Sequence, residues 1–412
     1  MVKIGLLCWK QGGGTNDYVL PKPTEPWKKG LKTVTKGTYK GKIPFEKALI
    51  SAMEYHYDDV EIMFMNKFDE KKLKQNDINF LVSLNLLYAW EKNDKEYKRV
   101  YKLMDDSSIN FYPNLKEQMF LFDKGGYLEY YEKKGLPIAP TFTIKGDRNV
   151  RRLIPKIEGK QWKSFVLKPH YAYANIAIGK FDMDDPNVTN KVTKYLTKYK
   201  RFPAFVCQEV MDGFAKFWEV KTFWINGKYK YHVAMKASGA VFSDSVIYED
   251  NTDDYGEVSP SVLKQLKKMG QKVVDHFPKH LNTHSNPPLY LRIDFGCCRG
   301  NSLDGKSYFL NEVEYAGCAI FAEESGVNNF TELWADAYYK KAKEYAPKES
   351  AQKESKTTRV KRNAKRTIQR RKRQTKRLTK RSTKRGTRRK LVPYSVRMRR
   401  RLRAGSRMNP SD

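Results

Sequence analysis

Cysteine and long apolar runs are both scarce in this sequence. Only 5 of its 412 residues are cysteine, and none lie in a Cys-x-x-Cys spacing, which argues against a disulfide framework or a zinc knuckle and favours a reducing compartment. The longest apolar stretch, residues 80–90, is too short and too interrupted for a membrane-spanning helix. The apolar run at 4–9 is likewise too short for a secretory signal. We therefore expect an intracellular protein without a membrane partner.

Acidic residues are also few, and the imbalance is concentrated at one end of the chain. The sequence has 80 lysines and arginines against 46 aspartates and glutamates. Residues 341–412 hold 29 of these basic residues and only 4 acidic ones, whereas the rest of the chain holds 51 and 42. Hydrophobic residues make up 40% of the sequence, which is enough to bury a core. The chain therefore combines a globular part, of two or three domains by its length, with a basic tail.

The tail, residues 347–412, has almost no large apolar side chains and contains a basic four-residue repeat that begins at Thr375, Thr379, Thr383 and Thr387. Such a segment cannot offset its ordering entropy and charge repulsion, so we expect it to be disordered. We expect it to bind nucleic acid or another polyanion without sequence preference, because it offers cations and almost no stacking surface. A nuclear address and a solubilising role stay open as alternatives for this segment. We expect the protein in the cytoplasm, with the nucleus or a nucleoprotein particle as alternatives.

Residues 1–105 have the pattern of a small α/β domain. Apolar runs at 2–8 and from 77 onward each predict a buried strand, and the segment 45–57 predicts a helix. Three glycines follow the first strand, but neither Gly-x-x-x-x-Gly-Lys-Ser/Thr nor Gly-x-Gly-x-x-Gly is present, which favours a plain turn over a phosphate loop. We find no functional motif in this domain.

A regular series of helices and strands follows. Asn114 is expected to cap the first helix, and Asn226-Gly227 to form the turn of a hairpin. Lys124 precedes the second helix, and Lys168 lies near the end of a buried strand. The predicted elements are helices at 115–121 and 127–134, strands at 164–170 and 204–210, a hairpin at 219–235, a helix from 260, strands at 290–295 and 308–314, and a helix at 329–345.

The last two of these strands end in acidic residues. Because side chains alternate along a strand, Arg292 and Asp294 share one face, and so do Glu312 and Glu314. Taken singly, acidic residues at strand ends are usually solvated. Three carboxylates on neighbouring strands, however, repel one another and are costly to bury unless a cation lies between them. Carboxylate oxygens suit Mg²⁺, which completes its shell with water and substrate phosphates, and the two lysines could contact the same phosphates.

In the order of these elements and motifs, residues 112–321 resemble the ATP-grasp superfamily, particularly D-alanine–D-alanine ligase and glutathione synthetase. The resemblance implies an α+β ATP-grasp fold, in which two α+β subdomains clasp ATP, preceded here by the small α/β domain and followed by the disordered tail. It implies an ATP-grasp domain at 106–346 with a small lid subdomain at about 141–212.

The resemblance also implies roles for the nucleotide-binding residues. An Asp-Lys before a helix and the lysine of a Lys-Pro strand contact phosphates in the family, a hinge strand lies beside adenine, and an acidic residue on the next strand binds ribose. The matching residues here are Lys124, Lys168, Gln208, Glu209, Val210 and Glu219.

The reacting end of the site is implied in the same way. Arg292 matches the family's arginine that faces the transferred phosphoryl group, and we assign it a catalytic role together with Lys168. Asp294, Glu312 and Glu314 match the metal ligands, although the family has asparagine at the last position. The implied cofactors are ATP and Mg²⁺, with room for two ions and with Mn²⁺ as a substitute.

A larger departure concerns the loop after the Lys-Pro strand, which is rich in glycine and serine in the family. Residues 170–179 hold a single glycine here, so phosphate transfer could be altered. The resemblance implies an ADP-forming ligase that joins an unidentified carboxylate to an unidentified amine through an acylphosphate. Two alternatives stay open: an ATP-grasp kinase, and a catalytically inactive nucleic-acid-binding or structural protein.

Overall fold

The computed structural model describes most of the globular part of the chain. The described residues are 1–8, 18–20, 25–36, 39–146, 149–170, 177–211, 213, 218–236, 255–256, 258–281, 287–298, 308–315 and 318–346, all within the compact unit Met1–Pro347. The predicted disordered tail and all but the ends of the glycine-poor loop lie outside them.

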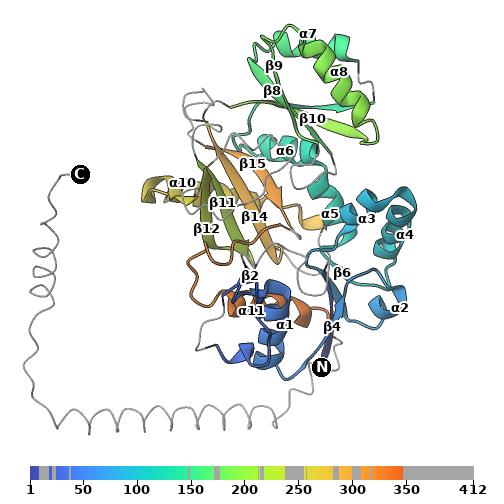
Figure 1. The fold of residues 1–412 in the computed structure, drawn as a ribbon, viewed down its shortest axis with the longest axis vertical. Helices are drawn as coiled ribbons and strands as arrows, with labels where there is room; N and C mark the ends of the chain where they lie inside the picture. Colours follow the sequence, from blue (N-terminus) through green and yellow to red (C-terminus); the bar gives the residue numbers. More distant parts are fainter. Residues whose placement is uncertain are drawn as a thin grey trace, which may run out of the picture. The chain divides into compact units, whose positions relative to one another are not determined.

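The described part of the chain combines helices and strands (Figure 1). In chain order they are β1 (Val2–Leu7), β2 (Tyr18–Val19), η1 (Pro26–Lys28), β3 (Ile43–Pro44), α1 (Phe45–His56), β4 (Val60–Met65), α2 (Glu70–Leu73), β5 (Ile78–Leu81), α3 (Leu86–Lys92), α4 (Asp94–Asp105), β6 (Phe111–Tyr112), α5 (Leu115–Phe122), α6 (Lys124–Lys133), β7 (Thr141–Lys145), α7 (Val150–Glu158), β8 (Ser164–Pro169), β9 (Gly179–Asp182), α8 (Val188–Lys198), β10 (Ala204–Glu209), β11 (Trp218–Ile225), β12 (Lys228–Lys236), β13 (Tyr255–Gly256), α10 (Pro260–Asp275), η4 (Lys279–Leu281), β14 (Tyr290–Cys297), β15 (Tyr308–Glu314) and α11 (Phe330–Lys343).

The first sheet is parallel and has the order β4-β1-β5-β6. Its central strands are nearly continuous apolar runs, as expected for a sheet covered on both faces. The strands expected from the runs at 2–8 and 77 onward and the helix expected at 45–57 are confirmed. Strand β6 extends this sheet to Tyr112, which lies beyond the predicted domain boundary at residue 105. That boundary stays a prediction.

Helices α5 and α6 connect the first sheet to the rest of the fold. Asn114 caps α5 through a reciprocal capping box with Glu117. Helix α6 begins at Lys124, three residues before the predicted start, because the Asp123 side chain accepts the Gly126 N–H at 3.0 Å and caps the helix there. Lys124 therefore lies in the first turn of a helix rather than in a loop.

The second sheet has the order β7-β10-β8-β9, with antiparallel pairing throughout. Together with α7 and α8 it encloses a hydrophobic core of its own, centred on Phe165, Val192 and Phe205. In Figure 1 this sheet and its two helices lie at the top of the view. Its elements run from 141 to 209, within the range predicted for a small lid subdomain.

The third sheet is antiparallel, with the order β13-β12-β11-β14-β15. The predicted hairpin turn is confirmed: Asn226 and Gly227 have φ values of 49° and 70°, which suit a two-residue turn of type I′. Helix α10 packs against this sheet. The first and third sheets share one continuous hydrophobic core, which helix α11 also joins.

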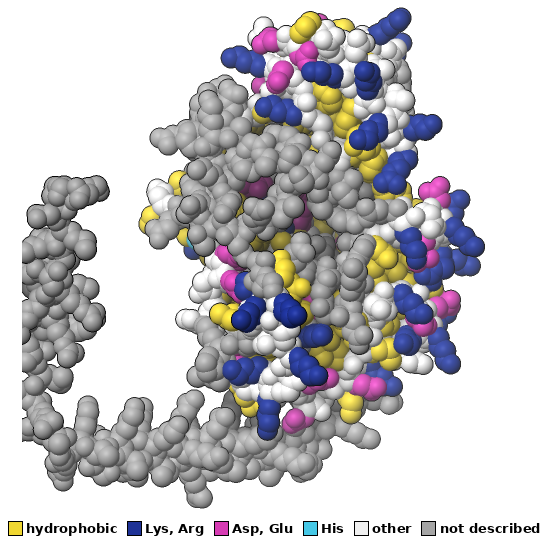
Figure 2. Space-filling model, viewed as in Figure 1, with side chains coloured by type: hydrophobic (Ala, Val, Ile, Leu, Met, Phe, Trp, Pro, Cys, Tyr) yellow, Lys and Arg dark blue, Asp and Glu magenta, His cyan; other side chains and the backbone are white. Residues whose placement is uncertain are grey.

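The surface charge, the cysteines and the helices can be compared with what the composition predicts. On the face drawn in Figure 2, lysine and arginine side chains of the described residues are interspersed with aspartate and glutamate. This matches the near balance of charge outside the tail. All five cysteines are buried, and none of them forms a disulfide. Among the helices of the described residues, none has the length and apolar character that a bilayer crossing requires.

Candidate functional site

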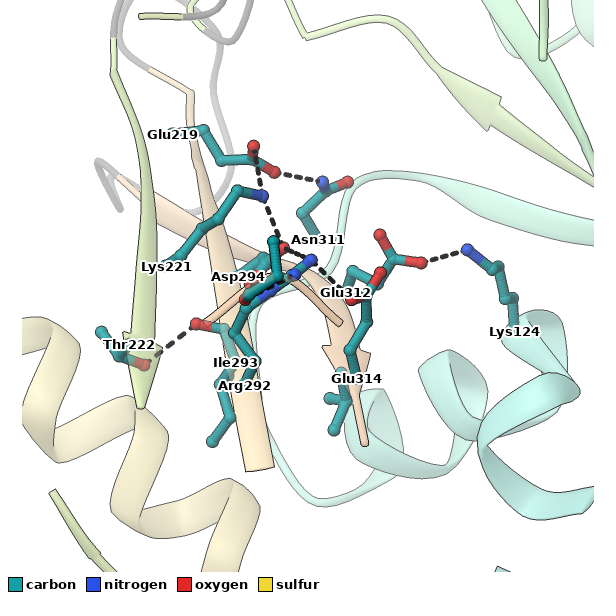
Figure 3. Close-up of polar contacts among 12 residues, drawn as sticks. Lys124, Glu219, Lys221, Thr222, Arg292, Ile293, Asp294, Asn311, Glu312 and Glu314 are labelled. Atoms are coloured by element: carbon teal, nitrogen blue, oxygen red, sulfur yellow. Dashed lines mark hydrogen bonds and ion pairs between the residues drawn. The ribbon is translucent and has the colours of Figure 1, made fainter. Parts of the chain in front are cut away.

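The acidic strand ends meet on neighbouring strands of the third sheet (Figure 3). Arg292 lies opposite Glu314, and Asp294 lies opposite Glu312. Arg292 donates two 2.9 Å hydrogen bonds to the Asp294 carboxylate, from Nε and Nη2. Its Nη2 also lies 2.7 Å from Glu314 Oε2. The structure thus brings three predicted site residues into one ion-pair network.

Lys221 completes this network, and the sequence analysis missed it. It lies opposite Asp294 in the pairing of β11 with β14, and its Nζ donates a 2.7 Å hydrogen bond to Asp294 Oδ2. The same ammonium lies 2.8 Å from Glu219 Oε2. Asp294 is fully buried and is neutralised by two cations of the chain itself. The alternation of β11 places Glu219 and Lys221 on one face, but only the strand order shows that this face meets Asp294.

The ion-pair partner of Glu312 comes from helix α6 and not from the third sheet. Lys124, in the first turn of α6, forms an ion pair with Glu312, as Figure 3 shows. Burial by itself would raise the pKa of Glu312, but Lys124, together with Lys168 and Arg292, outweighs burial and holds that pKa below its ordinary value. For Glu314, burial outweighs Arg292 and raises the pKa. The pKa values of two carboxylates on one strand face are therefore shifted in opposite directions.

A bulge in β15 brings one more side chain into the site. Asp294 pairs with Glu312 and the next residue, Phe295, pairs with Leu310, so Asn311 is the extra residue. Asn311 Nδ2 donates to Glu219 Oε1 at 3.0 Å, and its Oδ1 accepts from Lys168 Nζ at 3.4 Å. Alternation could not have predicted this, because a bulge breaks the period of two.

Lys168 extends from β8 of the second sheet toward this network. Its Nζ donates to Gln208 Oε1 at 2.9 Å as well as to Asn311, and within the described residues it makes no salt bridge. Burial lowers the pKa of Lys168 to about 8. A partly buried ammonium whose hydrogen-bond acceptors are neutral amides is a favourable contact for an incoming anion.

The predicted hinge residues lie at the end of β10, the strand beside β8. Gln208 is buried and bridges Lys168 and Thr141, to whose Oγ1 it donates at 3.1 Å. Glu209 and Val210 are held by their backbone N–H groups, which donate to Pro140 and Ser164.

The basic and acidic side chains of this site are equal in number. The four basic side chains are Lys124, Lys168, Lys221 and Arg292, and the four acidic ones are Glu219, Asp294, Glu312 and Glu314. Across the described ranges, no group of three His, Cys, Asp or Glu side chains is arranged to hold a metal ion. The cations that the sequence analysis required between the buried carboxylates are here supplied by the chain itself. Each of Glu312 and Glu314 keeps one oxygen outside these ion pairs, so their donor chemistry still fits Mg²⁺.

Comparison with known proteins rests on structure. No protein-family model matches this sequence, and no curated protein matches it. The structure is similar to that of the D-cycloserine synthetase DcsG, with a TM-score of 0.58 and 11% sequence identity, over 82% of this chain and 99% of that one. It is also similar to D-alanyl-alanine synthetase A from Vibrio cholerae, with a TM-score of 0.50 and 11% identity, over 82% of this chain and 98% of that one. At such low identity the likeness shows the fold alone.

Proposed function

We propose, from the ATP-grasp fold that this chain has, that it is an ATP-dependent ligase which joins a carboxylate to an amine. One observation carries the proposal. Lys124 and Lys168 come from two different elements and meet the same short stretch of β15, where one contacts Glu312 and the other Asn311. Two ammonium groups beside a carboxylate cluster suit a triphosphate that also carries a divalent cation.

The reaction that suits this arrangement has two steps. A substrate carboxylate attacks the γ-phosphorus of ATP, which forms an acylphosphate and releases ADP. The amine then attacks the acyl carbon, and phosphate leaves. Lys124, Lys168 and Arg292 would stabilise the negative charge that develops on the phosphoryl oxygens. Neither step needs a covalent nucleophile from the protein.

Asp294, Glu312 and Glu314 are the residues that would hold Mg²⁺ or Mn²⁺, as one ion or two. A bound divalent ion supplies charge neutralisation to the phosphates. In the structure Arg292 and Lys221 hold Asp294, whereas Glu312 and Glu314 each have an oxygen outside the ion pairs. We therefore assign the principal ligand role to these two glutamates of β15.

The nucleoside would lie along the end of β10. We assign Gln208, Glu209 and Val210 to the adenine side and Glu219 to the ribose. The support is their location: Gln208 contacts Lys168, and Glu219 reaches Lys168 through Asn311. Base and sugar would thus lie beside the lysine that contacts the phosphates.

Calorimetric titration with MgATP tests this proposal. Lys124→Ala should weaken binding about tenfold or more, because it removes a charge-assisted phosphate contact. Lys133→Ala is the matched control, since Lys133 lies on the same helix in an exposed pair with Glu129. Failure of the wild-type protein to bind nucleotide would favour the catalytically inactive alternative.

Products distinguish a ligase from a kinase. Phosphate release should be screened with amino acids and small peptides as carboxylate and amine donors. A ligase releases phosphate and leaves a C–N bond, whereas a kinase leaves a stable phosphorylated acceptor. The tail is proposed separately to bind nucleic acid or another polyanion, on the strength of its charge.

A further inference from the structure

Asp123 and His170 connect the two elements that carry the phosphate-binding lysines. His170 Nδ1 lies 2.9 Å from Asp123 Oδ1. Asp123 immediately precedes Lys124, and His170 follows Lys168 by two residues. We propose that this pair is a positioning device that fixes the separation of the Lys124 and Lys168 ammonium groups for one triphosphate, an inference that rests on the proposed function.

The histidine side of the pair is firmly held. The His170 side chain is 3% exposed, and its backbone N–H donates to Ala204 on the neighbouring strand at 2.9 Å. The hydrogen bond from His170 is the main cause that lowers the pKa of Asp123, so the carboxylate is ionised and the Nδ1–H is the donor. The histidine end of this charge-assisted bond is buried, whereas the Asp123 side chain is 35% exposed, so the buried imidazole is the fixed end to which the carboxylate is held.

Asp123 also caps helix α6. The same oxygen, Asp123 Oδ1, also accepts the Gly126 N–H at 3.0 Å and so caps α6. One carboxylate oxygen therefore fixes both the first turn of α6, which carries Lys124, and the end of β8, which carries Lys168.

Gly125 allows the close approach that the pair needs. A Cβ at this position would lie 2.1 Å from Thr143 Oγ1 on β7 and 3.1 Å from His170 Nε2. The first turn of α6 thus packs directly against the second sheet, at a distance that no larger residue permits. The separation of α6 from the end of β8 is therefore set by three features together: the glycine at 125, the cap from Asp123 and the buried His170.

Nucleotide titration of single and double variants tests this inference. His170→Ala and Asp123→Ala should each weaken binding of MgATP and ADP about tenfold, because each removes the hydrogen bond between the two side chains. The double variant should bind no worse than either single one, since both changes remove the same connection. His170→Asn should recover most of the affinity, because its Nδ2–H can take the place of the Nδ1–H.

Asn149→Ala is the control for loss of a helix cap alone, since Asn149 caps α7 by accepting the Arg151 N–H. Thermal melting of each variant shows whether it is folded. A lowered melting temperature with unchanged nucleotide affinity would mean that the pair is only structural, and additive losses in the double variant would mean that the two residues act separately. Either result overturns the inference and leaves the ligase proposal standing. Absence of nucleotide binding by the wild-type protein overturns both.

Discussion

Lys221 of β11 and Asp294 of β14 form a buried ion pair, with Nζ 2.7 Å from Oδ2. Arg292 joins the same carboxylate from its own strand. A buried carboxylate needs compensating charge, and here two basic side chains supply it before any ligand binds. Asp294 therefore organises Arg292 and Lys221, while Glu312 and Glu314 are more accessible to a ligand.

Lys221→Met should destabilise the protein by about 3 kcal/mol, because it leaves Glu219 without its lysine and Asp294 with Arg292 alone. Urea denaturation measures this free energy of unfolding. Lys230→Met on β12 is the control, since Lys230 is exposed. Equal effects of the two substitutions would show that the Lys221 ion pairs contribute little.

Glu312→Gln should lower nucleotide-dependent turnover at least a hundredfold, because Glu312 is a proposed ligand of the divalent cation and the partner of Lys124. Asp294→Ala should do the same, because it leaves Arg292 and Lys221 without their shared carboxylate. Phosphate release under single-turnover and steady-state conditions measures the effect. Glu129→Gln, at an exposed position of α6, should leave turnover unchanged. Activity of either site variant within about tenfold of the wild type would contradict the assigned roles.

Glu117 should make stability depend on pH. Burial raises its pKa to about 7, and although Oε2 accepts the Asn114 N–H, Oε1 has no hydrogen-bond partner among the described residues. Between the unfolded pKa near 4.5 and the folded pKa near 7, the folded state holds a proton that the unfolded state releases. The contribution of Glu117 to stability is therefore present below pH 4.5 and is lost as the pH rises toward 7.

Glu117→Gln tests this relation, because glutamine keeps the capping geometry without titrating. The difference in unfolding free energy between wild type and variant should change by about 3 kcal/mol across that interval, with the wild type relatively more stable at low pH. Urea denaturation at pH 5 and pH 7.5 measures it. A difference that stays constant with pH would show that Glu117 does not titrate there.

Deletion of 347–412 should abolish retention on a nucleic-acid column and leave MgATP binding unchanged, because the deleted segment holds 27 basic residues against 3 acidic ones. Binding of the full chain should fall steeply with salt. A truncated protein that is still retained at moderate salt would place the polyanion site in the globular part.

The sequence by itself determined the local elements and the residue types of the site. Strand alternation placed Arg292 with Asp294 and Glu312 with Glu314, and the turn at Asn226-Gly227 followed from the positive φ that those residues tolerate. The start of α6 was predicted three residues late, because the glycines after Lys124 obscured the cap that Asp123 provides.

Only the tertiary structure decided which residues meet. Lys221 reaches Asp294 because β11 lies beside β14, Asn311 reaches Lys168 because β15 bulges, and His170 reaches Asp123 because α6 packs on the second sheet. Local patterns follow from backbone geometry within a few residues, whereas these pairs span from 47 to 143 positions of the chain. Their partners are selected by strand order and packing, which no periodicity in a single sequence encodes.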